Sequence, residues 1–187
     1  MNSVYVVSGS PRSGTSMVMQ MLYIAGFDLL VDDKRKADRH NPKGYFEYEP
    51  VKNTATNNYW VDEAIGKAVK VVDYILPSLP IGDYKYKIIY MERNLREVLS
   101  SQNKMLKTKQ YVSSETLELL KSLKLEVIRK IKEREDFEIR YINYKWFFKN
   151  PRGSVTSILT LFDREADEST VMKMISTIDK DLYRNRY

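Results

Sequence analysis

The residues whose types and spacing best suit chemistry lie near the N-terminus, in the run Ser8-Gly-Ser-Pro-Arg-Ser-Gly-Thr-Ser16. An apolar stretch that predicts a strand precedes this run, and a stretch that predicts a helix follows it. Gly9 and Gly14 let backbone N–H groups approach an anion closely, and the first amides of the following helix are unpaired and favour negative charge. Arg12 adds a forked cation, and hydroxyls come from Ser13, Thr15 and Ser16. The run predicts a phosphate-binding loop. The alternative is a chance turn of small residues.

The position of the cation separates this loop from that of the nucleotide triphosphatases. The two glycines have the spacing of G-x-x-x-x-G-K-[ST], but Thr15 occupies the position of the lysine. The later strand that ends in Glu92-Arg93 also lacks an aspartate of the kind that binds Mg2+. We therefore expect phosphate binding without a metal site.

A second candidate anion-binding group is Arg93, which follows a predicted buried strand over Ile88–Met91. In open parallel sheets ligands bind at the carboxyl ends of the strands, so Arg93 is expected to face the same crevice as the loop. Asn94 is a good N-cap for the next helix, and Ser101 lies about two helical turns along it. Arg93 and Ser101 could thus reach one ligand group. The alternative for Arg93 is an ion pair with Glu92 or Glu97.

A third conspicuous stretch is Asn41-Pro-Lys-Gly-Tyr-Phe-Glu47, in which turn-forming residues precede aromatic side chains and an acid. It follows a polar stretch from Asp32 to Lys43 that predicts a surface loop. A loop near a phosphate site is a candidate for function. The alternative is a structural turn with half-buried Tyr45 and Phe46.

The remaining chain supplies elements that would position these residues. Strands are predicted over Ala68–Val72, Ile88–Met91 and Phe137–Tyr144, in addition to the N-terminal one. Helices are predicted over Thr15–Ala25, Tyr48–Ala68 and Glu168–Ile178, after Ser113 or Ser114, and after Asn150-Pro151. Strands that alternate with helices predict an α/β fold with a mostly parallel central sheet and helices on both faces.

Length and composition limit the classes of protein. A chain of 187 residues with 43% hydrophobic residues predicts a single domain over residues 1–187. The absence of cysteine excludes disulfides and thiolate metal sites and suits the cytoplasm. We see no signal peptide and no apolar run long enough to span a membrane. The net charge of +6 suits an anionic partner, but no helix-turn-helix, zinc-finger or RNP-type pattern supports nucleic acid.

Three blocks of the chain resemble the P-loop sulfotransferases that use 3'-phosphoadenosine 5'-phosphosulfate (PAPS), particularly their small bacterial members. Pro11-Arg-Ser-Gly-Thr-Ser16 resembles the family's loop for the 5'-phosphosulfate. The segment Ile89–Ser101 resembles its strand and helix for the 3'-phosphate, and Tyr141–Phe162 is similar to a weaker C-terminal block. Asn41–Glu47 also looks like a segment that covers the active site in bacterial members. The resemblance implies a three-layer P-loop-like fold and metal-independent transfer of a sulfuryl group from PAPS to an acceptor hydroxyl.

The resemblance also implies roles for particular residues. Ser13, Gly14, Thr15 and Ser16 would bind the 5'-phosphate, Arg93 and Ser101 the 3'-phosphate, and Arg12 the charge on the transferring oxygens. Lys70 resembles a lysine that assists the leaving group, although Lys70-Val-Val-Asp73 departs from the usual K-D-P-R. The general base would be Glu47 or His40.

The acceptor is open between small molecules and glycans, and Tyr45, Phe46, Tyr48, Tyr59 and Trp60 would form either an aromatic wall for it or part of the core. Two other functions remain open. One is a P-loop kinase or triphosphatase, and the other is a non-catalytic protein that binds adenosine bisphosphate.

Overall fold

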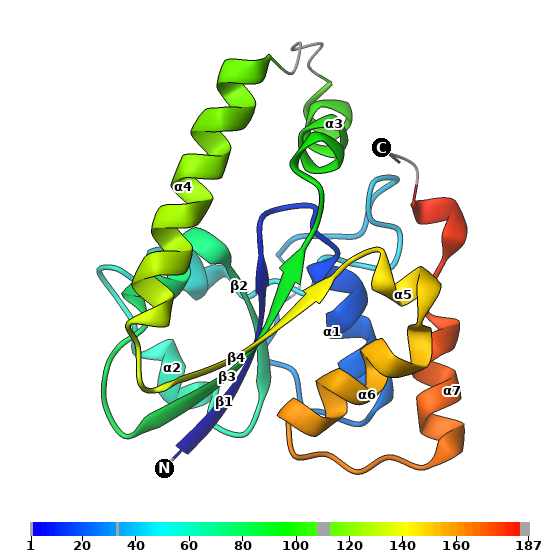
Figure 1. The fold of residues 1–187 in the computed structure, drawn as a ribbon. Coiled ribbons are helices and arrows are strands. Elements are labelled where there is room, and N and C mark those ends of the chain that lie inside the picture. Colours follow the sequence, from blue (N-terminus) through cyan, green and yellow to red (C-terminus); the bar gives the residue numbers. More distant parts are fainter. Residues whose placement is uncertain (1, 33, 108–112, 184–187) are drawn as a thin grey trace.

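The computed structural model describes residues 2–32, 34–107 and 113–183 (Figure 1). Its sheet has four parallel strands in the order β2–β1–β3–β4. Their bounds are Asn2–Gly9 for β1, Ala68–Val72 for β2, Tyr84–Glu92 for β3 and Phe137–Asn143 for β4. The α/β fold with a parallel sheet is therefore as predicted. Because β2 and β3 lie on opposite sides of β1, the chain reverses its strand order there, and ligands bind parallel sheets at such a point.

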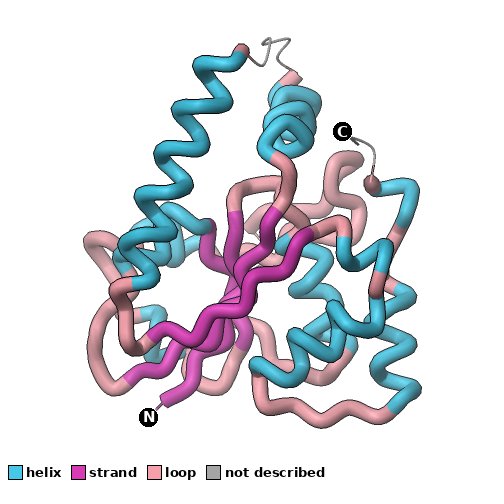
Figure 2. The backbone as a smooth tube through the Cα atoms, in the orientation of Figure 1, coloured by secondary structure: helices cyan, strands magenta, loops and turns pink. Residues whose placement is uncertain are grey.

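Helices cover both faces of the sheet, as Figures 1 and 2 show. On one face lie α1 (Thr15–Ile24), α6 (Pro151–Leu161) and α7 (Glu168–Ser176). On the other lie α2 (Trp60–Glu63), the 3-10 helix η2 (Asp73–Ser78) and one end of α4 (Ser114–Lys132). Side chains of β1 alternate between the two cores, since Val7 packs with the first group and Val6 with the second. The sheet is therefore the middle of three layers, with one core on each face.

A helix follows the carboxyl end of each of the strands β3 and β4. α3 (Leu95–Leu106) follows β3, and α5 (Trp146–Lys149) follows β4. The 3-10 helix η3 (Lys180–Leu182) comes after α7. The predicted caps are present, because the side chain of Asn94 accepts from Arg96 N and that of Asn150 accepts from Gly153 N.

The predicted helix over Tyr48–Ala68 is wrong. Residues Glu49–Asn53 form a 3-10 helix, η1, a turn follows, and α2 has only four residues. Thr54 and Thr56 bond through their hydroxyls to backbone carbonyls three residues earlier, which competes with regular helix. The segment 53–58 is rich in Asn and Thr, and such residues favour turns.

The apolar stripe of α4 is only partly buried. Leu117 and Ile131 are buried, whereas Leu123 is half exposed. Figure 1 shows the N-terminal half of α4 extending beyond the edge of the sheet. Within the three described ranges, no helix combines the length and the apolar character needed to cross a bilayer.

Candidate anion-binding cleft

The loop between β1 and α1 has backbone conformations with positive φ, which glycine adopts readily. Gly9 and Gly14 have φ of +142° and +104°, values that other residues rarely adopt. A Cβ on Gly9 would also lie 2.5 Å from Ser13 Oγ and 2.6 Å from Met91 O, so the loop closes tightly over the end of β3. Arg12 adopts a φ of +76° without being glycine. α1 begins at Thr15, which leaves its unpaired amides at the loop.

A cleft of about 370 Å³ opens beside this loop, within the range of small-molecule sites. Its walls come from the loop, the start of α1, residues 35–52, the second part of β2 and the second half of α3. Among the described residues that line it, six are cationic and one is a carboxylate, Glu47. The cations are Arg12, Arg35, Lys52, Lys70, Arg93 and Lys104. This excess of positive charge favours an anionic ligand.

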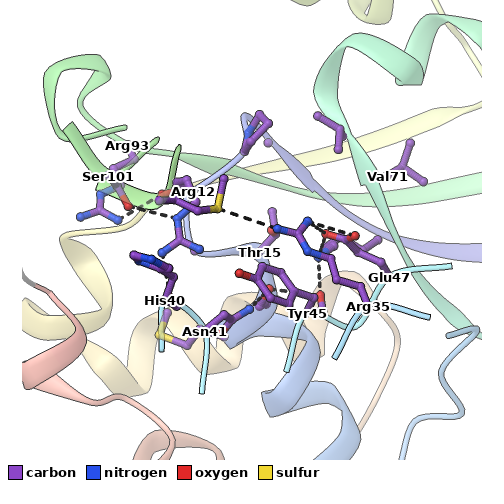
Figure 3. A pocket seen from close by; sticks show the side chains of 18 of the residues that line it. Arg12, Thr15, Arg35, His40, Asn41, Tyr45, Glu47, Val71, Arg93 and Ser101 are labelled. Carbon is purple, nitrogen blue, oxygen red and sulfur yellow. Dashed lines mark hydrogen bonds and ion pairs between the residues drawn. The ribbon is translucent and has the colours of Figure 1, made fainter. Parts of the chain in front are cut away.

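Arg12 connects the loop to two other parts of the cleft (Figure 3). Its Nε donates to Ser101 Oγ at 3.0 Å, and its Nη2 donates to the backbone oxygen of His40 at 2.9 Å. Burial lowers the pKa of Arg12, but a guanidinium remains charged at any physiological pH. The structure thus brings Arg12 and Ser101 together at the cleft.

Arg93 lines the cleft and is held from behind by a buried polar group. Its Nη1 donates to Arg12 O at 3.1 Å, and its Nε donates to Glu97 Oε2 at 2.9 Å. Glu97 is fully buried and also accepts from the Tyr183 hydroxyl at 3.0 Å. The guanidinium lies 4.4 Å from the ring centroid of Tyr144. Arg93 therefore forms the ion pair with Glu97 and also lines the cleft.

Glu47 and Lys70 meet on the other side of the loop. Glu47 Oε1 lies 3.1 Å from Lys70 Nζ and 2.9 Å from Arg35 Nη1, and Lys70 Nζ also donates to Tyr45 O. Lys70 is 8% exposed, and burial lowers its pKa to about 8 even though Glu47 raises it. Burial raises the pKa of Glu47, but Lys70 and Arg35 outweigh it and bring that pKa below its usual value.

Arg35 was not singled out by the sequence, because it lies in the polar stretch predicted as a surface loop. Its guanidinium lies 3.6 Å from the ring centroid of Tyr45. The signal that marks it is the basic run Lys34-Arg-Lys36 directly before the Asn41–Glu47 segment. From the sequence, Glu97 was expected only as a possible ion-pair partner of Arg93.

The second candidate base, His40, also lines the cleft. It is half-buried, and its Nε2 accepts from Arg39 Nε at 3.1 Å. Its backbone N–H donates to Asp38 Oδ1 at 2.7 Å. The hydrogen bond from Arg12 to the His40 carbonyl therefore holds the backbone of His40 at the cleft, while the imidazole contacts Arg39.

The hydroxyls of the loop lie in different places. Thr15 and Ser16 line the cleft with Gly14. Ser16 Oγ donates to Tyr45 O at 3.2 Å and accepts from Asn41 Nδ2 at 3.1 Å, which joins α1 to the 41–47 segment. Ser13 Oγ is buried and has no hydrogen-bond partner among the described residues, and Ser13 is absent from the lining.

The five aromatic residues of the expected wall are divided between the cleft and other places. Tyr45 and Tyr48 line the cleft. Trp60 is 2% exposed and packs in the core, and Tyr59 is 81% exposed. Phe46 packs against the core on the α1 side of the sheet, so only Tyr45 and Tyr48 of the five lie at the cleft. Among residues 2–32, 34–107 and 113–183, no cluster of three or more His, Asp or Glu side chains is placed to hold a metal ion.

Comparisons with known proteins identify the fold. The sulfotransferase domain of the Synechococcus PCC 7002 olefin synthase matches with a TM-score of 0.50 and 14% identity, over 98% of this chain and 79% of that chain. Retinol dehydratase in complex with androsterone and the inactive cofactor PAP has a TM-score of 0.55, and its complex with retinol and PAP has 0.57, both at 14% identity. Each of these matches covers 97% of this chain, which spans 65% and 66% of the two retinol dehydratase chains.

No protein-family model and no curated protein sequence matches the chain. At 14% identity the structural likeness shows the fold alone. The chain therefore has a fold that it shares with a sulfotransferase domain and with retinol dehydratase, which was solved in complex with PAP.

Proposed function

We propose that this chain transfers a sulfuryl group from PAPS to the hydroxyl of an acceptor molecule. The observation that carries the proposal is the convergence of two anion-binding groups on one cleft. The loop after β1 and the Arg93–Ser101 pair after β3 are joined by Arg12, whose side chain contacts Ser101 and whose carbonyl contacts Arg93. A ligand with phosphate at two positions fits this arrangement, and the fold is shared with PAP-bound proteins.

The residues present fit such a nucleotide. Gly14, Thr15 and Ser16 lie at the N-terminus of α1, where amides and dipole favour the 5'-phosphate end. Arg93 and Ser101 would hold the 3'-phosphate, and the bidentate fork of an arginine suits that group. The Ser13 hydroxyl would not contact the nucleotide in this arrangement, because it is buried and Ser13 does not line the cleft.

PAPS supplies an activated sulfuryl group: the new bond joins the acceptor oxygen to sulfur, the bond from sulfur to the 5'-phosphate oxygen breaks, and that oxygen keeps the electron pair. Arg12 stabilises charge on the transferring oxygens. Lys70, in the middle of β2, stabilises charge on the leaving oxygen or gives it a proton, which its pKa of about 8 permits near neutral pH. Glu47 accepts the proton of the acceptor hydroxyl, with His40 as the second candidate. No step requires a metal ion.

Binding and transfer assays test the proposal. Adenosine 3',5'-bisphosphate should raise the Tm of the chain without Mg2+, and Arg93→Ala should abolish the shift. Arg96→Ala is the matched control, because it removes an exposed arginine three residues later, at the start of α3. Glu47→Gln should retain bisphosphate binding and lose about 100-fold in transfer rate.

Two results would contradict the proposed transfer, and a third would change the residue that acts as base. Stabilisation only by ATP with Mg2+ would favour a kinase or triphosphatase. Tight bisphosphate binding with no transfer to a broad set of hydroxyl compounds would favour a non-catalytic binding protein. Wild-type turnover by the Glu47 variant would exclude Glu47 as the base and leave His40.

A further inference from the structure

The cleft holds more positive charge than the proposed nucleotide uses. Arg12, Arg93 and Lys70 are assigned to the phosphates and the leaving group, and Arg35 and Lys52 also line the cleft. Figure 3 shows Arg35 beside Glu47, at the opposite end of the view from Arg93 and Ser101. This end contains the candidate base, so it is where an acceptor hydroxyl would lie.

The guanidinium of Arg35 is held in place by its neighbours and is still accessible to a ligand. The ring of Tyr45 supports one face of its guanidinium at 3.6 Å, and Met105 Sδ lies 3.8 Å from Nη2. Its side chain nevertheless remains 43% exposed. Its ion pair with Glu47 is partly in water, and ion pairs of this kind contribute little free energy. Exchanging that carboxylate for one on a ligand therefore costs little.

The same part of the cleft offers apolar surface. Tyr48, Val51 and Ile75 line it, and they come from the segment around η1 and from η2. Val71 of β2 lies at the same end as Glu47 in Figure 3. Val71 is fully buried, so the partly exposed ring of Tyr48 is the main apolar contact for an aromatic or aliphatic ring. Arg35 and Lys52 suit an anionic substituent on that ring.

From this juxtaposition we propose that the acceptor is an anionic hydroxyl compound, a ring or aliphatic body that carries a carboxylate or similar group, and that Arg35 recognises its charge. The inference rests on the proposed sulfuryl transfer and names the acceptor class for that site. When Arg35 turns to the acceptor, Glu47 keeps only Lys70 as a cationic partner. Because Arg35 is one of the charges that lower the pKa of Glu47, its departure makes Glu47 a stronger base. Binding of a charged acceptor thus increases the basicity of Glu47, which then accepts the proton of the acceptor hydroxyl.

A matched pair of acceptors tests this inference. The probes are 3-(4-hydroxyphenyl)propanoate and its methyl ester, which share the phenol and differ in charge. With PAPS, kcat/KM should favour the carboxylate by about tenfold or more, roughly the contribution of one charge-assisted hydrogen bond. Arg35→Gln should remove most of that preference, and Arg35→Lys should retain part of it. Lys36→Gln removes an exposed lysine next in the chain and should leave the preference unchanged.

The outcomes separate the two proposals. Equal kcat/KM for the two phenols, or an undiminished preference in a folded Arg35→Gln variant that still binds bisphosphate, would overturn the acceptor class while transfer itself stands. A wild-type chain that binds no bisphosphate and sulfates neither phenol would overturn the proposed function and this inference with it.

Discussion

Replacing Lys70 with methionine should change how the free energy of unfolding depends on pH. Lys70 is 8% exposed, and burial lowers its pKa from 10.5 to about 8. In the unfolded chain the lysine has its usual pKa, so between pH 8 and 10.5 the unfolded state binds more protons than the folded state. The stability of the wild-type chain therefore rises with pH through this window, relative to a chain that lacks Lys70.

The size of the effect follows from the two pKa values. At ~1.4 kcal/mol for each pKa unit, the change from 10.5 to about 8 corresponds to roughly 3 kcal/mol over the whole window. About 2 kcal/mol of it should be visible between about pH 7 and about pH 9.5. The variant also removes one of the two donors to Tyr45 O and leaves Ser16 Oγ, but that loss is independent of pH and cancels from the comparison.

Urea unfolding, followed by tryptophan fluorescence at several pH values, measures this difference. The wild-type chain should gain stability over Lys70→Met as pH rises. Lys36→Met controls for the loss of one positive charge, because Lys36 is exposed. If the wild-type and Lys70→Met chains change in parallel across the range, Lys70 titrates as it does in the unfolded chain, and the argument from burial is refuted.

Three further predictions concern the loop, the support of Arg93 and metal dependence. Gly14→Ala should cost about 1–3 kcal/mol of stability, because φ is +104° and the new Cβ would lie 2.6 Å from the Tyr144 ring; an unchanged Tm would contradict this. Tyr183→Phe should weaken bisphosphate binding several-fold, because Glu97 loses a donor and holds Arg93 less firmly; a lower Tm with unchanged affinity would leave Tyr183 a purely structural role. Sulfuryl transfer should proceed equally in EDTA and in Mg2+, and activity that requires Mg2+ would refute metal independence.

The sequence predicted features that depend on neighbours in the chain. Asn94, Ser113 and Asn150 cap the helices that follow them, because each side chain accepts from a backbone N–H two or three residues later. The strands β3 and β4 were equally visible from their apolar residues. Parallel pairing then brings the loop after β1 and Arg93 after β3 to one edge, so their proximity at the cleft was also predictable.

Features that depend on distant residues were not predictable. The helix expected over Tyr48–Ala68 is interrupted by turns within residues 53–58. Trp60, which follows these turns, packs in the core on one face of the sheet. Arg35 reaches Glu47 twelve residues away and Met105 seventy residues away. Tyr183 reaches Glu97 across 86 residues. No local pattern specifies such contacts, since each joins segments that are far apart in the sequence.

The backbone of Arg12 explains why the loop depends on groups outside it. A non-glycine residue with φ of +76° is strained by about 1–3 kcal/mol and persists only when surrounding contacts hold it. Those contacts are Arg93 on its carbonyl, and Ser101 and the His40 carbonyl on its side chain. This backbone conformation places the Arg12 side chain at the cleft. Arg12 lies between the two glycines, where the triphosphatase motif specifies no cation. Arg93 thus has two functions in our proposal, binding the 3'-phosphate and fixing Arg12, so its removal should impair transfer more than the loss of one phosphate contact alone.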